Sequence, residues 1–384
     1  MDKYRGAIIG LGWMGMLNDI GIRWENGAPK VVRGVWQPEK DRGVWHVDDA
    51  DRPFPELNLE RQYYYHHMAF GEAPVTYAEA MSNRPEIDLV AGAERDKQRL
   101  ELFGQHYGVE SLYTDAEEML AAEKPEIVAI SSNVKGRSHL TCLAVEHGAK
   151  GILVEKPICY TLEEADRMVK TCDDAGVPWV GGATSVNHPS FGKAKELINE
   201  GAIGEIISIE APGNSNLSQH QNWAFFVEGT PAWVIGIGDQ PKRESGTNEF
   251  QGTGIMVTTD GLMVHFRMGA PAVRISGTTG EISHWDHGAR WQLVQEMETN
   301  ARERRVEMPW PEPNMTPGYT VIQGLSDIIN CVEGNVDRPQ NHGRDVAMAF
   351  EVEIALKISS AQGGVRIDLP LKDRSLELEY DWHR

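Results

Sequence analysis

Basic residues are scarce in this chain relative to acidic ones. Its 384 residues include 37 lysines and arginines against 57 aspartates and glutamates, which gives a formal net charge of −20. A charge of this sign repels nucleic acid and anionic membrane surfaces, so we expect neither as a partner. The net charge is still compatible with a local basic pocket that binds an anionic substrate. The candidate residues for such a pocket are Arg23, Arg33, Arg137 and Arg243.

Cysteine is equally sparse, and long apolar runs are missing. The four cysteines show neither a CxxC pair nor a metal-finger spacing, so we interpret them as scattered buried thiols and expect a reducing cytoplasm and no bound metal. A span of the membrane needs roughly twenty consecutive apolar residues, and no segment of the chain provides them. The first strand follows the N-terminus almost at once, which leaves no room for a signal peptide.

A glycine-rich turn follows the first apolar strand. Ala7-Ile8-Ile9 leads directly into Gly10-Leu11-Gly12-Trp13-Met14-Gly15. In a dinucleotide-binding fold the backbone passes close to a pyrophosphate at this place before a helix starts, and only glycine leaves room for that approach. The motif alone is weak evidence, but it predicts where a cofactor would bind.

Strand-like and helix-like segments then alternate up to about residue 185. This alternation predicts βαβ units and a parallel sheet, a Rossmann domain over residues 1–185. Gly148 and Gly176 suit the left-handed ends of two of its helices. The expected strands are 87–93, 127–131, 151–154 and 178–183, and the expected helices are 96–107, 138–147 and 162–175.

Residues 186–384 show a different pattern. A helix over 191–200 precedes strands rich in Ile, Val and Thr, and Asp260-Gly261 between two of them is typical of a hairpin. We therefore expect a second α+β domain with an open, largely antiparallel sheet. Helices 319–333 and 344–361 would cover one face of this sheet, and the other face would join subunits of a homodimer or homotetramer.

Residues 20–75 interrupt the expected connection from the first helix to the second strand. The segment is too aromatic for a disordered linker, and it contains Trp24, Trp36, Trp45, Tyr63, Tyr64, Tyr65, His66 and His67. It could be a flap that packs on the protein or on a neighbouring subunit, or a lid that stacks on a sugar ring. A metal site at His66-His67 is disfavoured, because adjacent residues of an extended chain point to opposite faces.

A second motif, Glu155-Lys156-Pro157, closes the buried strand 151–154. Ligands of doubly wound sheets bind at the carboxyl ends of strands, so Lys156 brings a proton-transfer group to the expected place. With the glycine turn, Asn187-His188-Pro189 and the helix that leads into Gly201-Ala202-Ile203-Gly204, these residues make the chain resemble the Gfo/Idh/MocA family of nicotinamide-dependent sugar and polyol oxidoreductases.

The cofactor site follows from the fold and from this resemblance. Glu94, at the end of the second strand, suits the acceptor of the ribose hydroxyls, and its charge favours NAD over NADP. Arg95 keeps NADP possible, because it could meet a phosphate or stack on adenine. By resemblance, the nicotinamide side would further involve Ser131, Ser132, Asn133, Glu155, Pro157 and His139, with Trp13 and Met14. The alternatives are that His139 is an ordinary residue opening a helix and that Trp13 and Met14 only pack.

The resemblance also implies the catalytic residues. Lys156 matches the catalytic lysine of the family, and Glu155 could orient it. The family's Asp-x-x-x-His corresponds to Asn216 and His220 in one register, or to Ser215 and Gln219 in a register shifted by one residue. We favour His220, because it retains a titratable group. Asn187, Gln219 and His220, with Lys156, are the expected substrate-binding residues.

Three functions stay open at this point. The first is an NAD-dependent dehydrogenase that oxidises a secondary hydroxyl of a sugar, glycoside or cyclitol. The second is a glycoside hydrolase that uses transient oxidation, elimination and re-reduction. The third is a non-enzymatic, cofactor-sensing binding protein. Net formation of NADH from a free sugar separates the first from the second.

Overall fold

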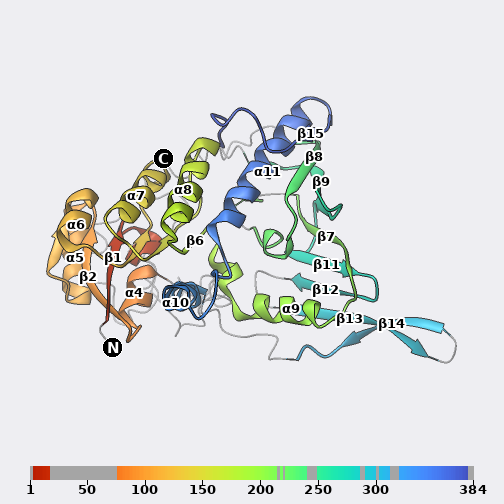
Figure 1. Ribbon diagram of the computed structural model, residues 1–384, viewed down its shortest axis with the longest axis horizontal. Helices are drawn as coiled ribbons and strands as arrows, with labels where there is room; N and C mark the ends of the chain where they lie inside the picture. The colour runs from red at the N-terminus through yellow and green to blue at the C-terminus, as the bar shows by residue number, and fades with distance from the viewer. Residues whose placement is uncertain are drawn as a thin grey trace, which may run out of the picture. The chain divides into compact units, whose positions relative to one another are not determined.

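The computed structural model of the chain describes residues 3–17, 76–213, 217–218, 221–239, 249–285, 290–299, 302–311 and 320–378 (Figure 1). The described residues form two compact units. One contains those up to Asn187 and those from Thr320 to Gly343, and the other contains those from His188 to Pro311 and from Arg344 onward. The whole segment predicted as an insertion, residues 20–75, lies outside the described residues.

A parallel sheet forms the centre of the first unit. Its six described strands lie in the order β3-β2-β1-β4-β5-β6, so the winding reverses between β1 and β4. This is the switch point at which doubly wound sheets bind their ligands. The strands are β1 (Tyr4–Ile9), β2 (Ile87–Ala93), β3 (Ser111–Tyr113), β4 (Ile127–Ile130), β5 (Gly151–Val154) and β6 (Trp179–Gly181).

Helices connect these strands and cover the sheet. Asp96 and Asp115 cap α5 and α6 through their carboxylates, and Thr161 opens α8 with a complete capping box. Gly176 ends α8 in the left-handed conformation, as the sequence predicts. The helices are α4 (Tyr77–Ser82), α5 (Lys97–Tyr107), α6 (Ala116–Glu123), α7 (Val134–Glu146) and α8 (Leu162–Ala175), with the short turns η1 (Trp13–Leu17) and η2 (Thr184–Asn187).

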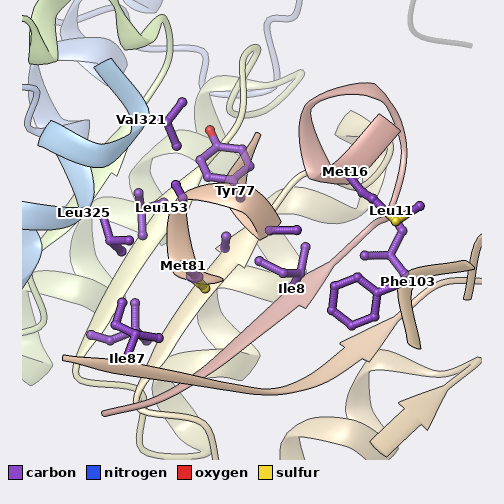
Figure 2. Close-up of a cluster of buried hydrophobic side chains, with 14 of the residues drawn as sticks. Ile8, Leu11, Met16, Tyr77, Met81, Ile87, Phe103, Leu153, Val321 and Leu325 are labelled. Atoms are coloured by element: carbon purple, nitrogen blue, oxygen red, sulfur yellow. The ribbon is translucent and has the colours of Figure 1, made fainter. Parts of the chain in front are cut away.

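One helix of the first unit comes from late in the chain. The sequence predicts that a helix over 319–333 covers the second sheet, and this prediction is wrong, because α10 (Thr320–Val332) packs on α4 and β5. Figure 2 shows Val321 and Leu325 of α10 near Tyr77 and Leu153 in one apolar cluster. A Cβ on Gly151 would lie 2.2 Å from Ile328 Cγ2. Because glycine has no side chain, this position leaves room for the helix to pack on β5.

The second unit contains a mixed sheet that is mostly antiparallel. Its nine described strands lie in the order β14-β13-β12-β11-β7-β10-β9-β8-β15, and only β7 and β10 pair in parallel. The strands are β7 (Ile206–Pro212), β8 (Pro231–Ile237), β9 (Thr253–Thr258), β10 (Met263–Arg267), β11 (Val273–Gly277), β12 (Gly280–Trp285), β13 (Arg290–Thr299), β14 (Arg302–Met308) and β15 (Ile367–Asp368). The hairpin predicted at Asp260-Gly261 joins β9 to β10.

Helix α11 (Gly343–Ala361) lies against this sheet where two strands carry glycine. Cβ atoms on Gly236 and Gly254 would lie 2.3 Å from Leu356 O and 2.6 Å from Leu356 Cδ2. The turn η3 (Ala224–Phe226) and helix α9 (Pro189–Asn199), capped by the His188 side chain, belong to the same unit. A parallel sheet with helices followed by a largely antiparallel α+β unit confirms the fold class that the sequence predicts.

Candidate active site

The glycine turn lies against the loop that follows β4. Gly10 has φ +89°, and a Cβ at this position would come within 2.5 Å of Ser132 N. Ser131 Oγ donates a hydrogen bond of 2.6 Å to the carbonyl of Gly10. A Cβ on Gly15 would lie 2.1 Å from the oxygen of Gly10. Gly10 and Gly15 are therefore required by the close packing of the turn itself.

Gly12 has a different environment. Among the described residues, the one atom within 4 Å of a Cβ built there is Arg99 Nη1, at 3.7 Å. The described part of the chain thus leaves space in front of Gly12, as a backbone that approaches a pyrophosphate requires. This part of the chain therefore fits a dinucleotide.

Glu94 lies beside the same turn. One of its carboxylate oxygens accepts a hydrogen bond of 2.8 Å from Leu11 N, and the other accepts one of 3.1 Å from Asp96 N. The carboxylate thus joins the end of β2 to the glycine turn after β1. Its position suits an acceptor for the hydroxyls of an adenosine ribose.

The other predicted cofactor residues have mixed surroundings. Trp13 and Met14 are partly buried and pack against the core of the first unit, as the packing alternative expects. Asn133 caps α7 with its side chain, and Arg95 is exposed. His139 does not open a helix, because α7 begins at Val134 and places His139, an exposed residue, in its second turn.

Lys156 follows β5 on the same edge of the sheet. The backbone N–H of Glu155 donates to Ile130 O at 2.9 Å, so the start of the Glu155-Lys156-Pro157 segment runs beside β4. Glu155 and Pro157 are buried, whereas Lys156 is half-buried, and the Lys156-Pro157 peptide bond is cis. The structure therefore presents the lysine between two buried neighbours.

Two residues next to this segment were not assigned a role there by the sequence analysis. Tyr77, in α4, donates a hydrogen bond of 3.0 Å from its hydroxyl to Glu155 Oε2. Arg137, in α7, donates to Ser132 O at 3.0 Å and to Pro157 O at 2.5 Å. Arg137 is 3% exposed, so its guanidinium is engaged by backbone carbonyls instead of an open anionic pocket. No sequence signal links Tyr77 to Glu155, because 78 residues separate them.

Asn187 ends η2, which follows β6 at this edge. Its side chain is 1% exposed, and neither its Nδ2 nor its Oδ1 has a hydrogen-bond partner among the described residues. A Cβ on Gly324 of α10 would lie 2.5 Å from Asn187 Nδ2. A buried amide without a partner costs free energy, which makes it a candidate for binding a ligand.

The remaining candidates belong to the stretch from residue 215 to residue 220. Ser215, Asn216, Gln219 and His220 lie outside the described residues. The neighbouring Ser218 is described, and the buried carboxylate of Glu353 in α11 accepts from its N–H at 2.9 Å and from its hydroxyl at 2.6 Å. Glu353 also accepts from Phe250 N at 3.0 Å. No pattern in the sequence predicts this role of Glu353, because Ser218 and Glu353 are 135 residues apart.

Ionisation around Lys156 is shaped by burial. Burial, followed by the charge of Glu155, raises the pKa of Tyr77 well above its ordinary value, so the hydroxyl keeps its proton. Burial lowers the pKa of Arg137, and the carboxylate of Glu155 opposes this change. The edge therefore combines an open backbone turn, a ribose acceptor and a lysine beside a buried charge pair, which suits proton transfer next to a bound dinucleotide.

The family comparison agrees with this geometry. The model of the family described as "Oxidoreductase family, NAD-binding Rossmann fold" matches residues 70–182. That range contains Glu94, the loop after β4 and the Glu155-Lys156-Pro157 segment. The family resemblance expected from the sequence is thus confirmed for this part of the chain.

Curated relatives match the same part. A D-apiose dehydrogenase of Paraburkholderia graminis is 35% identical over 117 residues, which cover 30% of this chain and 31% of the relative. A 2,7-anhydro-N-acetylneuraminate hydratase of Mediterraneibacter gnavus is 30% identical over 101 residues, 26% of this chain and 27% of the relative. The chain thus spans about a third of the length of these relatives.

Similarity of fold extends further than similarity of sequence. The WlbA dehydrogenase from Bordetella pertussis, solved with NADH and UDP-GlcNAcA, aligns over 97% of this chain and 99% of its own, with a TM-score of 0.63 and 16% identity. This identity supports the fold alone. Among the described residues, no helix is long and apolar enough to cross a membrane, and no three His, Cys, Asp or Glu side chains gather as a metal site would require.

Proposed function

Because residues 70–182 belong to an oxidoreductase family with an NAD-binding Rossmann fold, we propose that this protein is an NAD-dependent dehydrogenase. Its substrate would be a sugar, glycoside or cyclitol, of which it would oxidise a secondary hydroxyl. The observation that carries the proposal is the placement of Lys156 after β5, on the sheet edge that holds the open turn at Gly12 and the Glu94 carboxylate. The name of the D-apiose dehydrogenase supports the substrate class.

Bound NAD would supply the hydride acceptor. The glycine turn would approach its pyrophosphate and Glu94 its adenosine ribose, which favours NAD over NADP because a carboxylate repels a 2′-phosphate. Ser131, Ser132 and Asn133 would contact the nicotinamide ribose, and Arg95 the adenosine end. This assignment follows the family resemblance and the position of these residues beside the turn.

Lys156 would act as the base. Its neutral amine takes the proton from the substrate hydroxyl while the carbon gives up hydride. Asn187 would hydrogen-bond a substrate hydroxyl with its buried amide. By the family resemblance, Gln219 and His220 would also bind the substrate, and Asn216 would hold the His220 ring. An asparagine brings no charge to stabilise an imidazolium, so Lys156 would carry most of the proton transfer.

The test is NADH formation from a panel of free sugars, glycosides and cyclitols, with D-apiose included. Lys156→Ala should lower turnover by roughly two to four orders of magnitude, because the acid/base group is lost, while NAD affinity stays nearly unchanged. Lys150→Ala is the matched control, since Lys150 precedes β5 at its other end and pairs with Glu126 at 2.7 Å. A Lys156→Ala enzyme with near-normal turnover would remove the lysine from this role. A higher rate with NADP than with NAD would reverse the cofactor assignment.

A second candidate is a reaction without net redox change. The relative named as a hydratase favours it, because that name denotes the addition of water. A glycoside hydrolase that uses transient oxidation, elimination and re-reduction would need the same cofactor and the same lysine. The two candidates separate in one assay, because such a hydrolase releases sugar from a glycoside without accumulating NADH.

We further propose that the protein assembles as a homodimer or homotetramer through the second sheet. Val257 on β9 and Met263 on β10 are paired, half-buried neighbours on the face opposite the contact of Gly254 with Leu356. An apolar sheet face of this kind is typical of a subunit contact.

A further inference from the structure

Three polar side chains lie buried together next to Lys156. Tyr77 of α4 and Arg137 of α7 are each 3% exposed, and Glu155, at the end of β5, is 7% exposed. Polar groups buried to this extent persist only where each charge and each hydrogen-bonding atom is compensated. The cluster therefore constrains the chain where it reaches Lys156.

The Glu155 carboxylate is compensated from two elements. Tyr77 donates to its Oε2 at 3.0 Å, and the positive charge of Arg137 interacts with it through the buried interior. Removing one partner of a buried ion pair destabilises the fold by more than the intact pair stabilises it, because the other charge is left buried without compensation. A carboxylate that lost the Tyr77 hydroxyl would keep only the compensation from Arg137, and its charge would act more strongly on Lys156, the next residue in the chain.

The guanidinium of Arg137 constrains the backbone on both sides of the site. It donates to Ser132 O in the loop after β4 and to Pro157 O directly after the lysine. These two loops would flank the nicotinamide ribose. Arg137 thus fixes the spacing between the loop that would bind the cofactor and the segment that carries the lysine.

We propose that Tyr77 and Arg137 are positioning residues for proton transfer at Lys156, Tyr77 by holding the Glu155 carboxylate and Arg137 by holding the Pro157 carbonyl. The proposal rests on the proposed role of Lys156 as the base. Neither residue would touch the substrate. Their effect would be to hold in place the two neighbours of the lysine, Glu155 and Pro157.

Other titratable groups around the cluster act mainly on Arg137. Tyr160 and Cys159, in the segment after Pro157, interact with its charge, and Glu164 and Asp166 of α8 act on Cys159. Burial raises the pKa of the Cys159 thiol well above its ordinary value, so this thiol stays neutral near pH 7. Among these groups, Glu155 is the acidic residue directly adjacent to Lys156 in the chain.

Two substitutions, Tyr77→Phe and Glu155→Gln, should shift the titration of the Lys156 amine in opposite directions. In Tyr77→Phe, Glu155 loses a hydrogen bond and attracts the ammonium more strongly, so the amine of Lys156 should titrate at higher pH. In Glu155→Gln, the negative charge disappears and the uncompensated Arg137 repels the ammonium, so the amine should titrate at lower pH. A merely structural defect would not produce shifts of opposite sign.

The experiment is an NMR titration of the full-length protein with ¹³C-methylated lysines, in which Lys156→Arg identifies the signal. Tyr77→Phe should move the titration of Lys156 up by about one pH unit and lower turnover on the acid limb about tenfold, with NAD affinity retained. Tyr107→Phe is the matched control. Its hydroxyl donates to the Glu79 carboxylate at 3.3 Å, away from Lys156, and it should leave the titration unchanged.

An unshifted Lys156 signal in a folded Tyr77→Phe protein would overturn the role of Tyr77. If that variant fails to fold, Glu155→Gln and Arg137→Lys decide, and unchanged titration and turnover in both would overturn the proposal. The expected shifts in a protein that turns over no sugar would support the positioning role and contradict the proposed dehydrogenase. Turnover without the shifts would support the dehydrogenase and contradict the positioning role.

Discussion

Individual residues of the glycine turn carry different constraints. Gly10 has a positive φ and no room for a Cβ beside Ser132, whereas the φ of Gly12 is not in the left-handed region and the described residues leave space in front of it. Both glycines belong to one motif in the sequence. The structure separates the glycine that the fold requires from the glycine that a cofactor would require.

Alanine at each glycine should therefore give a different defect. Gly10→Ala should lower the free energy of unfolding by about 1–3 kcal/mol, because a left-handed residue with a side chain is strained and crowded. Gly12→Ala should keep the wild-type melting temperature and weaken NAD about tenfold or more, because its methyl group occupies the space that a pyrophosphate needs. Thermal unfolding and NAD titration of both variants test this. Equal defects in both measurements would contradict the distinction.

At the scale of elements, α11 anchors two segments of the second unit through one buried carboxylate. Glu353 accepts hydrogen bonds from Ser218 and Phe250, residues that precede and follow stretches lying outside the described residues. Burial raises the pKa of Glu353 above 4.5, and the hydrogen bonds from Ser218 and Phe250 oppose this change.

This raised pKa predicts a pH dependence of stability. The folded state binds the proton of Glu353 more tightly than the unfolded chain, so the stabilisation is fully present below pH 4.5 and is lost as pH rises through the folded pKa. The unfolding free energy of wild type minus that of Glu353→Gln should therefore fall as the pH rises above 4.5. Urea unfolding measures it, and Glu228→Gln, with a side chain 76% exposed, is the control. A difference that grows with pH would contradict this sign.

At the scale of the whole molecule, the proposed assembly depends on the second sheet. Val257→Asp would place a charge among half-buried apolar neighbours on β8 and β10, such as Trp233 and Met263. We expect this variant to be monomeric by light scattering, because a buried unpaired carboxylate is costly in a subunit contact. Val336→Asp, at a position 44% exposed in the first unit, should leave the mass unchanged. A monomeric wild type, or a Val257→Asp protein of unchanged mass, would remove this face as the interface.

The sequence by itself determined the features that depend on neighbouring residues. The parallel strands around the glycine turn, the left-handed ends at Gly148 and Gly176 and the position of Lys156 after β5 all follow from local spacing and glycine chemistry. These features hold because hydrogen bonding and backbone conformation act over a few residues. The short elements β3 and α6 were missed, since segments of this length give weak periodicity.

Only the tertiary structure decided which distant residues meet. The apolar stripe of α10 is visible in the sequence, but whether it packs on the first or the second sheet depends on Gly151, more than 160 residues earlier in the chain. The partners of Glu155 and Glu353 likewise come from distant elements. A buried carboxylate is stable only with such partners, and a single sequence does not contain the contacts that bring them together.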